Sequence, residues 1–231
     1  MTADPGRRDR QMNIIARIRN PYDSKFGIPR QSGLAEEVVS EIIFEPEYRV
    51  AEALRGIEEF SHLWLIWAFD RAERKAWSPT VRPPRLGGNR RVGVFATRSP
   101  YRPNAIGLSC VKLLGVEKGK DGPVLKVAGA DLMNGTPIYD IKPYLPYADC
   151  RPEATGGFTD RTEKRTVQVV FPEGSDAGLS GEEKRALAAV LREDPRPAYQ
   201  EDPERIYAFE FGGKHVAFRV ADGVLYVLKA E

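Results

Sequence analysis

The sequence predicts a mostly-β protein, with a larger β domain up to about residue 150 and a small α+β domain after it. Apolar segments with the length and composition of strands recur through the first domain, and turns rich in Gly and Pro separate them. Because no helices alternate with these strands, a doubly wound parallel sheet is not expected. The one pronounced amphipathic helix pattern lies late in the chain, at residues 182–192, after a predicted linker over residues 151–165.

The first domain is predicted to begin at residue 12, after a disordered lead-in over residues 1–11 that is rich in charge and Pro. Residues 46–59 favour a short helix, because three of their apolar side chains fall on one helical face. Residues 60–69 are the most hydrophobic segment and favour a strand buried on both faces. The predicted strands of this domain are residues 12–19, 38–44, 60–69, 109–117 and 124–130.

The second domain is predicted over residues 166–231, and its first strand over residues 166–171. Ser180 and Glu183 have the spacing of a capping box, which opens the helix at residues 182–192. Three further strands are expected to form a meander whose turns are Gly-Gly and Asp-Gly pairs. These strands are residues 206–211, 214–220 and 224–228.

Charge and cysteine content exclude several classes of protein. The formal net charge is +2, so any nucleic-acid site must be a local patch rather than the whole surface. Cys110, Cys150 and the two histidines lack metal-ligand spacing, so neither a metal site nor a Cys–His nucleophile is expected. No secretory signal and no apolar run of membrane-spanning length is seen, which predicts a cytoplasmic protein with reduced thiols.

The stretch from Val92 to Ser109 opens as a short strand and then becomes a polar loop that is stiffened by Pro100 and Pro103 and contains Arg98, Ser99, Tyr101, Arg102 and Asn104. Two prolines so close together remove two backbone donors and fix φ, so the loop is neither helix nor central strand. It presents two guanidiniums, a phenol and an amide from a stiff backbone, which suits a polar or anionic ligand. The alternative is an Arg-rich surface loop without a ligand.

Positive charge is concentrated between residues 82 and 102, where six arginines occur with no Asp or Glu. Arginine forks suit phosphate, and Trp77 or Tyr101 could stack on a base. A solvated loop with acidic neighbours elsewhere in the fold is the alternative, and nucleic-acid contact is the favoured interpretation. The six arginines are Arg82, Arg85, Arg90, Arg91, Arg98 and Arg102.

A second loop with functional character is predicted over residues 131–149, where three aspartates and three tyrosines lie among three prolines. Rigid carboxylates and phenols could bind an amine, a ribose or a sulfonium. Turn-forming aspartates beside half-buried tyrosines are the structural alternative. The sequence has no G-x-G-x-x-G after a strand, no P-loop, no H-E-x-x-H and no nucleophile elbow, so the residues alone indicate no reaction.

Several of these stretches together resemble the TsaA/TrmO family, and they occur in the same order from about residue 13 to the C-terminus. Residues 151–180 carry no motif of this kind. The stretches that carry the resemblance are residues 27–34 (GIPRQSGL), 60–64 (FSHLW), 82–88 (RPPRLGG), 92–109, 131–137 (DLMNGTP), 140–146 (DIKPYLP) and 194–199 (DPRPAY).

The resemblance implies an S-adenosylmethionine-dependent methyltransferase that acts on the N6 nitrogen of N6-threonylcarbamoyladenosine at position 37 of tRNA. It implies an N-terminal antiparallel β-barrel that holds the cofactor, unlike the Rossmann-like sheet of most methyltransferases. It also implies a homodimer and a C-terminal domain that helps to hold the tRNA anticodon stem-loop. By motif, the cofactor would be bound by Gln31, Ser32, Gly33, Leu34, Asp70, Arg71, Arg98, Leu108, Ala128, Gly129, Ala130 and Asp131.

Two further groups of residues follow from this hypothesis. The acceptor nitrogen must lose a proton, and Asp140 and Tyr139 are the candidate catalytic bases. A non-catalytic RNA-binding or scaffold protein remains an alternative, as does a methyltransferase for another RNA or small substrate. The candidate RNA contacts are Arg82, Arg85, Arg90, Arg91, Tyr101, Arg102 and Arg196.

Overall fold

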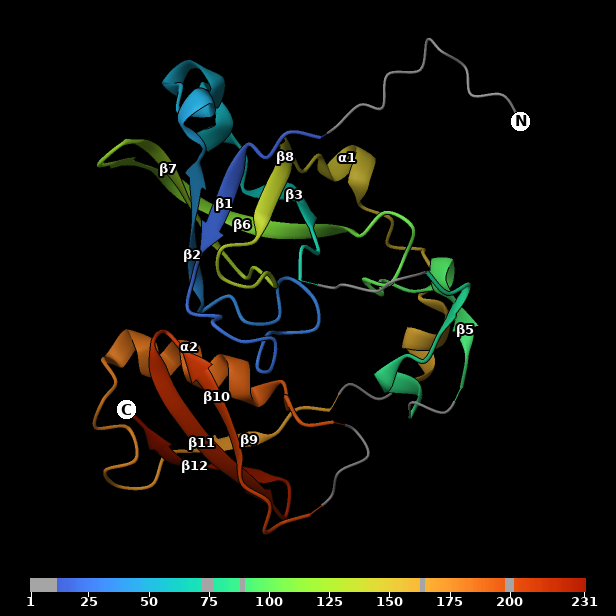
Figure 1. The fold of residues 1–231 in the computed structure, drawn as a ribbon, viewed down its shortest axis with the longest axis vertical. Helices are drawn as coiled ribbons and strands as arrows, with labels where there is room; N and C mark the ends of the chain where they lie inside the picture. The colour runs from blue at the N-terminus through green and yellow to red at the C-terminus, as the bar shows by residue number, and fades with distance from the viewer. Residues whose placement is uncertain (1–11, 72–76, 88–89, 163–164, 198–201) are drawn as a thin grey trace.

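The computed structural model describes residues 12–71, 77–87, 90–162, 165–197 and 202–231 (Figure 1). The predicted lead-in at residues 1–11 lies outside the described residues, as do Tyr199 and the side chain of Arg85. Among the described residues, no helix combines the length and apolar character needed to cross a membrane. Two bodies are visible in Figure 1, one built from the first 150 residues and one from the C-terminal part.

Six antiparallel strands form the first body, and the ladder closes on itself because β8 pairs back with β1. The strand order around this closed barrel is β1-β2-β7-β6-β3-β8. Its core is apolar and is filled by the alternate side chains that point inward. The strands are β1 (Ala16–Arg19), β2 (Val39–Phe44), β3 (His62–Ala68), β6 (Ile106–Gly119), β7 (Gly122–Ala128) and β8 (Pro137–Pro143).

The prediction that residues 60–69 form a strand buried on both faces is half wrong. Leu63, Leu65 and Trp67 of β3 are buried, but Trp64 and Ile66 between them are partly exposed. A strand of a closed barrel has one face toward the core and one toward the outside, so aromatic content alone does not indicate burial on both faces.

Two other predictions about this domain are corrected. Residues 46–59 form three short 3₁₀ segments instead of a helix: Pro46–Tyr48, Ala51–Leu54 and Ile57–Glu59. Gly56, at φ 84°, separates the second and third of these segments, and Tyr48, Leu54 and Ile57 pack against the barrel core. Residues 131–149 are not one loop, because they contain β8 and the short helix α1 (Pro146–Asp149). The prolines of this segment stand at the ends of β8 and at the start of α1, where proline is tolerated.

The segment between β3 and β6 forms an excursion beside the barrel, on the right of Figure 1. It contains a two-stranded ladder of β4 (Thr80–Val81) and β5 (Val92–Gly93). Two 3₁₀ segments, Pro84–Leu86 and Val94–Ala96, lie in the same excursion.

The C-terminal body is a four-stranded sheet with one helix packed on it, as the pattern predicts. The order β10-β11-β12-β9 combines the expected antiparallel meander with a parallel pairing of β9 to β12. Ser180 and Glu183 form both hydrogen bonds of the capping box at the start of α2 (Gly181–Arg192). The remaining elements are a 3₁₀ segment at Gly157–Arg161, β9 (Gln168–Val170), β10 (Tyr207–Phe211), β11 (Lys214–Ala221) and β12 (Val224–Ala230).

The barrel topology gathers three connecting segments at one end. Strands β1, β3 and β7 end there, and β2, β6 and β8 begin there, as the pairings Ala68↔Ile106 and Val39↔Ala128 show. Residues 20–38, 69–105 and 129–136 therefore all leave the barrel at this end, which we call the loop end. Every stretch that was expected to bind the cofactor lies on one of these segments or at the strand ends beside it.

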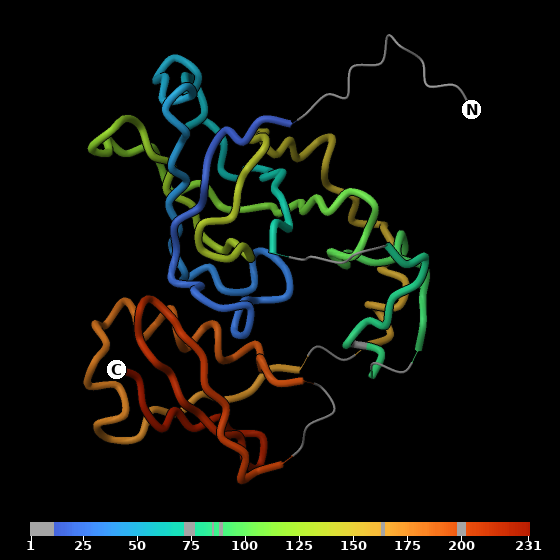
Figure 2. The backbone as a smooth tube through the Cα atoms, viewed as in Figure 1, coloured from blue at the N-terminus to red at the C-terminus, as the bar shows by residue number. Residues whose placement is uncertain are grey.

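The loop end rests on the C-terminal body. Tyr22 and Val38 are buried in the same apolar cluster as α2 and the strands of the C-terminal sheet. Gly27 packs so closely on Phe209 that a Cβ atom there would lie 2.5 Å from the ring, and its φ of 95° suits glycine alone. Figure 2 shows the chain of residues 20–38 running between the barrel and the C-terminal sheet. This contact fixes one wall of the loop end.

Candidate functional site

A chain of buried hydrogen bonds crosses the wall of the barrel at the loop end. Trp67 Nε1 donates to Ser109 Oγ at 2.9 Å, and the Ser109 hydroxyl donates to Asp131 Oδ1. Ser109 is fully buried because its position on β6 points inward, opposite Leu65. Gly107, one inward position earlier, leaves room for the Trp67 ring, since a Cβ atom there would lie 2.2 Å from it. The serine thus sets the orientation of the aspartate.

Asp131 is a partly desolvated carboxylate with one cationic neighbour. Burial raises the pKa of its carboxyl group, and the Ser109 hydrogen bond and the Arg98 guanidinium each oppose that rise. A carboxylate held in this way gains from an additional positive charge nearby, because water solvates it poorly. The arrangement suits an ammonium or sulfonium ligand.

The segment 27–34 is hydrogen-bonded to β6 and to the connection between β7 and β8, which carries Asp131. Gly33 N donates to Gly129 O at 2.8 Å, and the Cys110 amide donates to Ser32 Oγ at 3.2 Å. A Cβ atom on Gly129 would lie 3.1 Å from Gly33 Cα, so the two backbones approach as closely as only glycine permits at φ 74°. This steric cause applies to Gly129, whereas a Cβ atom on Gly33 would meet nothing within 4 Å and its φ of 78° is what favours glycine there.

Arg98 connects the third segment to the same group. Its Nη1 donates to Gln31 Oε1, so the polar loop that contains Pro100 and Pro103 and the 27–34 segment are bonded side chain to side chain. Three stretches distant in the sequence therefore meet at the loop end. The predicted cofactor residues that the structure brings together are Gln31, Ser32, Gly33, Arg98, Gly129 and Asp131, with Leu34, Ala128 and Ala130 adjoining them along the chain.

Three other predicted cofactor residues also lie at the loop end, but the contacts of the described residues do not bond them to this group. Leu108 is 52% exposed and points outward from β6, away from its inward neighbour Ser109. Asp70 is exposed in the turn after β3. Arg71 contacts the same 129–136 segment, where its Nη1 donates to Met133 Sδ at 3.3 Å.

The two candidate bases lie on β8, at a β-bulge. Ile66 pairs with Asp140 and Trp67 pairs with Ile138, so Tyr139 is the extra residue of the bulged strand. Asp140 shares the outer face with Ile66, and its Oδ2 forms an ion pair with Lys142 Nζ at 2.8 Å. Ser109 points inward from β6 and Asp140 outward from β8, whereas Asp131 lies on the connection between β7 and β8 at the loop end. The structure does not bring the candidate bases into contact with that group.

The candidate RNA contacts differ in how far they are already engaged. Arg82 and Arg90 are exposed, and Arg91 Nη1 donates to Thr80 Oγ1 at 3.0 Å across the β4–β5 ladder. Tyr101 and Arg102 are half-buried. Arg196 is bound by both oxygens of Asp194, and its side chain is 16% exposed. The Asp194 pair fixes the loop after α2 and leaves Arg196 less available to phosphate than the arginines of the excursion.

Sequence reasoning missed the residues that support the site. Ser109 and Trp67 were assigned to strands, although a serine at an inward position between apolar neighbours is a usable signal of a buried hydrogen bond. Asn20 follows the first predicted strand, and its side-chain amide donates to Leu132 O at 2.8 Å. Its backbone amide donates to Asn134 Oδ1 at 3.3 Å. These contacts hold the 129–136 segment against the end of β1.

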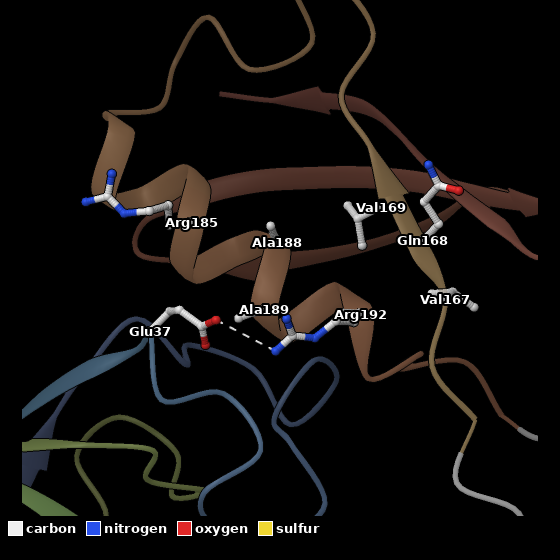
Figure 3. A pocket seen from close by; sticks show the side chains of 8 residues that line it. All are labelled: Glu37, Val167, Gln168, Val169, Arg185, Ala188, Ala189 and Arg192. Carbon is white, nitrogen blue, oxygen red and sulfur yellow. Dashed lines mark ion pairs between the residues drawn. The ribbon is translucent and has the colours of Figure 1, made fainter.

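A separate hollow of about 340 Å³ lies between α2 and β9 (Figure 3). Val167, Val169, Ala188 and Ala189 give it apolar walls. Arg192 at its rim is directed toward Glu37 of the barrel connection, and the two form an ion pair at 3.7 Å. The described residues contain no cluster of three or more His, Cys, Asp or Glu side chains that could hold a metal.

Comparison with known proteins places the chain beside a set of RNA-modifying proteins. The family model for the tRNA-methyltransferase O N-terminal domain matches residues 17–150, and the model for the TrmO C-terminal domain matches residues 164–231. A tRNA (adenine(37)-N6)-methyltransferase of Escherichia coli K12 is 42% identical over 229 residues, covering 96% of this chain and 97% of that protein.

Two further similarities concern the cofactor and the fold. A Pseudomonas aeruginosa protein, provisionally named as an S-adenosylmethionine-dependent methyltransferase, is 43% identical over 201 residues. The match covers 84% of this chain and 85% of that protein. A crystal structure of TrmO from P. aeruginosa superposes with a TM-score of 0.80 at 31% identity, and the match covers 99% of each chain.

Proposed function

The chain belongs to the tRNA-methyltransferase O family, and we propose that its acceptor is the N6 nitrogen of N6-threonylcarbamoyladenosine at position 37 of tRNA. Its activity is S-adenosylmethionine-dependent methylation of the N6 position of adenine 37, in agreement with relatives that match almost its whole length. The observation that supports the proposed site is the meeting of three segments at the loop end through the Arg98–Gln31 and Ser109–Asp131 hydrogen bonds.

The residues at the loop end fit the chemical groups of S-adenosylmethionine. The cofactor supplies the methyl group, which is carried on a positively charged sulfur. Its amine, carboxylate, ribose and adenine are groups that the site can bind. Asp131, desolvated beside the barrel wall, suits the cationic groups, and Arg98 suits the carboxylate. Ser32 and Gln31 offer a hydroxyl and an amide for the remaining polar groups. The close approach of Gly33 to Gly129 leaves backbone rather than side chains at this surface.

The residues of this chain would act mainly by positioning. The polar side chains of the site are already held by hydrogen bonds, Arg98 to Gln31 and Ser109 to Asp131, so little conformational entropy is lost when a ligand binds. The acceptor nitrogen must give up its proton as the new N–C bond forms, and Asp140 or Tyr139 is proposed to take that proton. Because Asp140 lies on the outer face with Lys142, this role requires the modified base and the methyl group of the cofactor to meet on the outside of β8.

The remaining parts of the proposal concern partners. The exposed arginines of the excursion are proposed to contact tRNA phosphates, with the C-terminal domain adding contacts to the anticodon stem-loop. A homodimer and a cytoplasmic location are proposed on the basis of the family resemblance. Residues 12–150 and 166–231 are proposed as the methyltransferase and tRNA-contact domains.

A calorimetric titration of the full chain with S-adenosylmethionine tests the site. Arg98→Ala should weaken binding about tenfold or more, because it removes a charge-assisted contact. Arg55→Ala is the matched control, since Arg55 is an exposed arginine in the segment that connects β2 to β3 at the other end of the barrel. Equal affinities for both variants would remove Arg98 from the site.

A methyl-transfer assay then tests the acceptor. Threonylcarbamoylated tRNA should be methylated and the same tRNA without this group should react far more slowly. Equal rates would contradict the proposed acceptor while leaving the methyltransferase activity in place. Full turnover of Asp140→Asn/Tyr139→Phe at saturating substrate would contradict the proposed bases. Absence of S-adenosylmethionine binding, with or without tRNA, would favour the RNA-binding scaffold alternative.

A further inference from the structure

Two large aromatic side chains are exposed together on the excursion. Trp77 is 52% exposed and Phe95 is 72% exposed, and their rings stack with centroids 6.4 Å apart and planes inclined by 29°. Large aromatic side chains are normally buried, so an exposed pair in contact is a sign of a binding surface. We call the Trp77–Phe95 pair with the neighbouring Arg102 the aromatic platform.

The backbone beneath the platform is firmly held. The β4–β5 ladder continues past its last pair, because Val94 N donates to Pro79 O at 2.9 Å. Val94 is buried and anchors the 3₁₀ segment, so Phe95, the next residue, points outward. The platform is therefore a fixed surface feature of the excursion.

Arg102 adds a cation at the edge of the platform. Its guanidinium lies 5.9 Å from the centroid of the Phe95 ring, and Nη1 donates to Thr97 O at 2.8 Å. An arginine beside an aromatic face is a common arrangement for stacking a nucleobase, since it adds a cation–π contact and can reach a phosphate.

The charge around the platform favours RNA over a second copy of the chain. Residues 77–104 contain six arginines and no carboxylate. A two-fold contact through the platform would place these arginines against their own copies, which is electrostatically unfavourable. A polyanion with unstacked bases meets both features of the surface.

The platform is also close to the candidate cofactor site along the chain. Phe95 and Arg98 are three residues apart, a span of at most about 11 Å, and Arg98 is bonded to Gln31. A base stacked on Phe95 therefore belongs to a nucleotide near the one whose base is methylated.

We propose that the Trp77–Phe95–Arg102 platform stacks an unpaired base of the tRNA anticodon loop that neighbours nucleotide 37, and so holds the loop while the target base enters the site. This inference rests on the proposed function and assigns a part of the substrate to a surface outside the cofactor site. Because the base is recognised by its face, the platform accepts either purines or pyrimidines.

The test uses the full chain and an anticodon stem-loop RNA that carries 2-aminopurine at one loop position at a time. Stacking quenches 2-aminopurine fluorescence, so wild-type protein should quench it at one or two positions. Phe95→Ala and Trp77→Ala should abolish this quenching and raise KM for tRNA about tenfold. Phe95→Tyr should restore both, and the affinity for S-adenosylmethionine should not change in any variant.

Tyr147→Ala is the matched control, because Tyr147 is 85% exposed on α1, outside the excursion. Unchanged quenching in Phe95→Ala would overturn the platform. A shift of Phe95→Ala from dimer to monomer in sedimentation would also overturn it, because it would assign the patch to contact with a second copy of the chain. Quenching that depends on Phe95 in a protein that transfers no methyl group would support the platform and contradict the proposed function. Methyl transfer by all variants at wild-type KM would support the proposed function and contradict the platform.

Discussion

The candidate cofactor site and the aromatic platform share the chain segment that carries Arg98, but their polar and aromatic groups are arranged in opposite ways. At the loop end, Ser109 is buried and Asp131 partly buried, and the exposed Arg98 is bonded to Gln31 within the protein. On the excursion, Trp77 and Phe95 are exposed over a braced backbone. A small ligand is held best by donors that are already in place, whereas a large RNA must reach groups on the surface. This comparison gives four predictions.

The largest effect is expected where the loop end is most crowded. Gly107→Val places a side chain into the Trp67 ring, because even a Cβ atom would lie 2.2 Å from it. The free energy of unfolding should fall by about 3 kcal/mol, and the Trp67–Ser109–Asp131 bonds should be lost with it. Urea unfolding measures the change. Gly93→Ala on the excursion is the control, since a Cβ atom there meets nothing within 4 Å, and it should leave stability nearly unchanged.

The second effect concerns the charge of Asp131. Asp131→Asn keeps the shape of the side chain but removes the negative charge, and affinity for S-adenosylmethionine should fall about thirtyfold. Affinity of the wild type should also fall at acid pH, as the carboxylate is protonated. Calorimetry over a pH series measures both, with Asp121→Asn in the exposed β6–β7 turn as the control. A thirtyfold loss in the control, or none in Asp131→Asn, would contradict the assigned role.

The same substitution has a stability consequence of defined sign. Burial raises the pKa of the Asp131 carboxyl group, so the folded protein holds this proton at a pH where the unfolded chain has lost it. Stability from this group is therefore complete below the ordinary carboxyl pKa and is lost as pH rises through the raised pKa. Asp131→Asn should be more stable than wild type above that window and should bind the cofactor less well. A site that costs stability in this way is typical of a functional carboxylate.

The third effect belongs to the excursion. Arg82→Ala/Arg91→Ala should weaken tRNA binding about tenfold and reduce the slope of log affinity against log salt by roughly one per lost phosphate contact. Affinity for S-adenosylmethionine should stay at the wild-type value, because neither arginine contacts the group around Asp131. Filter binding over a salt series, with Arg55→Ala as the control, measures the difference. Equal salt slopes would assign the phosphate contacts to another surface.

How much of this could be read from the sequence depends on the range of the interactions. Short-range patterns were reliable: the capping box of Ser180 and Glu183, the two hairpin turns and the C-terminal meander all occur where expected. The helix expected at residues 46–59 does not form because the backbone leaves the helical conformation at Val50 and again at Gly56, and the strand β8 was hidden by prolines that stand at its ends. Local signals do not show whether a proline lies inside an element or at its boundary.

The candidate site shows the same division. The residues of the 27–34 and 128–131 stretches were named from motif resemblance, and the structure brings them together with Arg98. The sequence alone could not show that Leu108 and Asp140 point outward while Ser109 points inward, because that depends on which face of β6 and β8 closes on the core. The structure also adds the stacking of Trp77 on Phe95, which are separated by 18 positions and joined only through the β4–β5 ladder.

The smallest effect is expected at the contact between the loop end and the C-terminal body. Glu37 and Arg192 form an ion pair across this contact at 3.7 Å, and their side chains are 41% and 49% exposed. An exposed pair of this kind contributes about 0.5 kcal/mol or less, whereas Tyr22, Val38 and Phe209 are buried together beside it. Glu37→Gln should therefore leave stability and S-adenosylmethionine affinity almost unchanged, as measured by urea unfolding and calorimetry, with Glu58→Gln as the exposed control. A loss of more than about 1 kcal/mol would show that charge, rather than apolar contact, fixes the wall of the loop end.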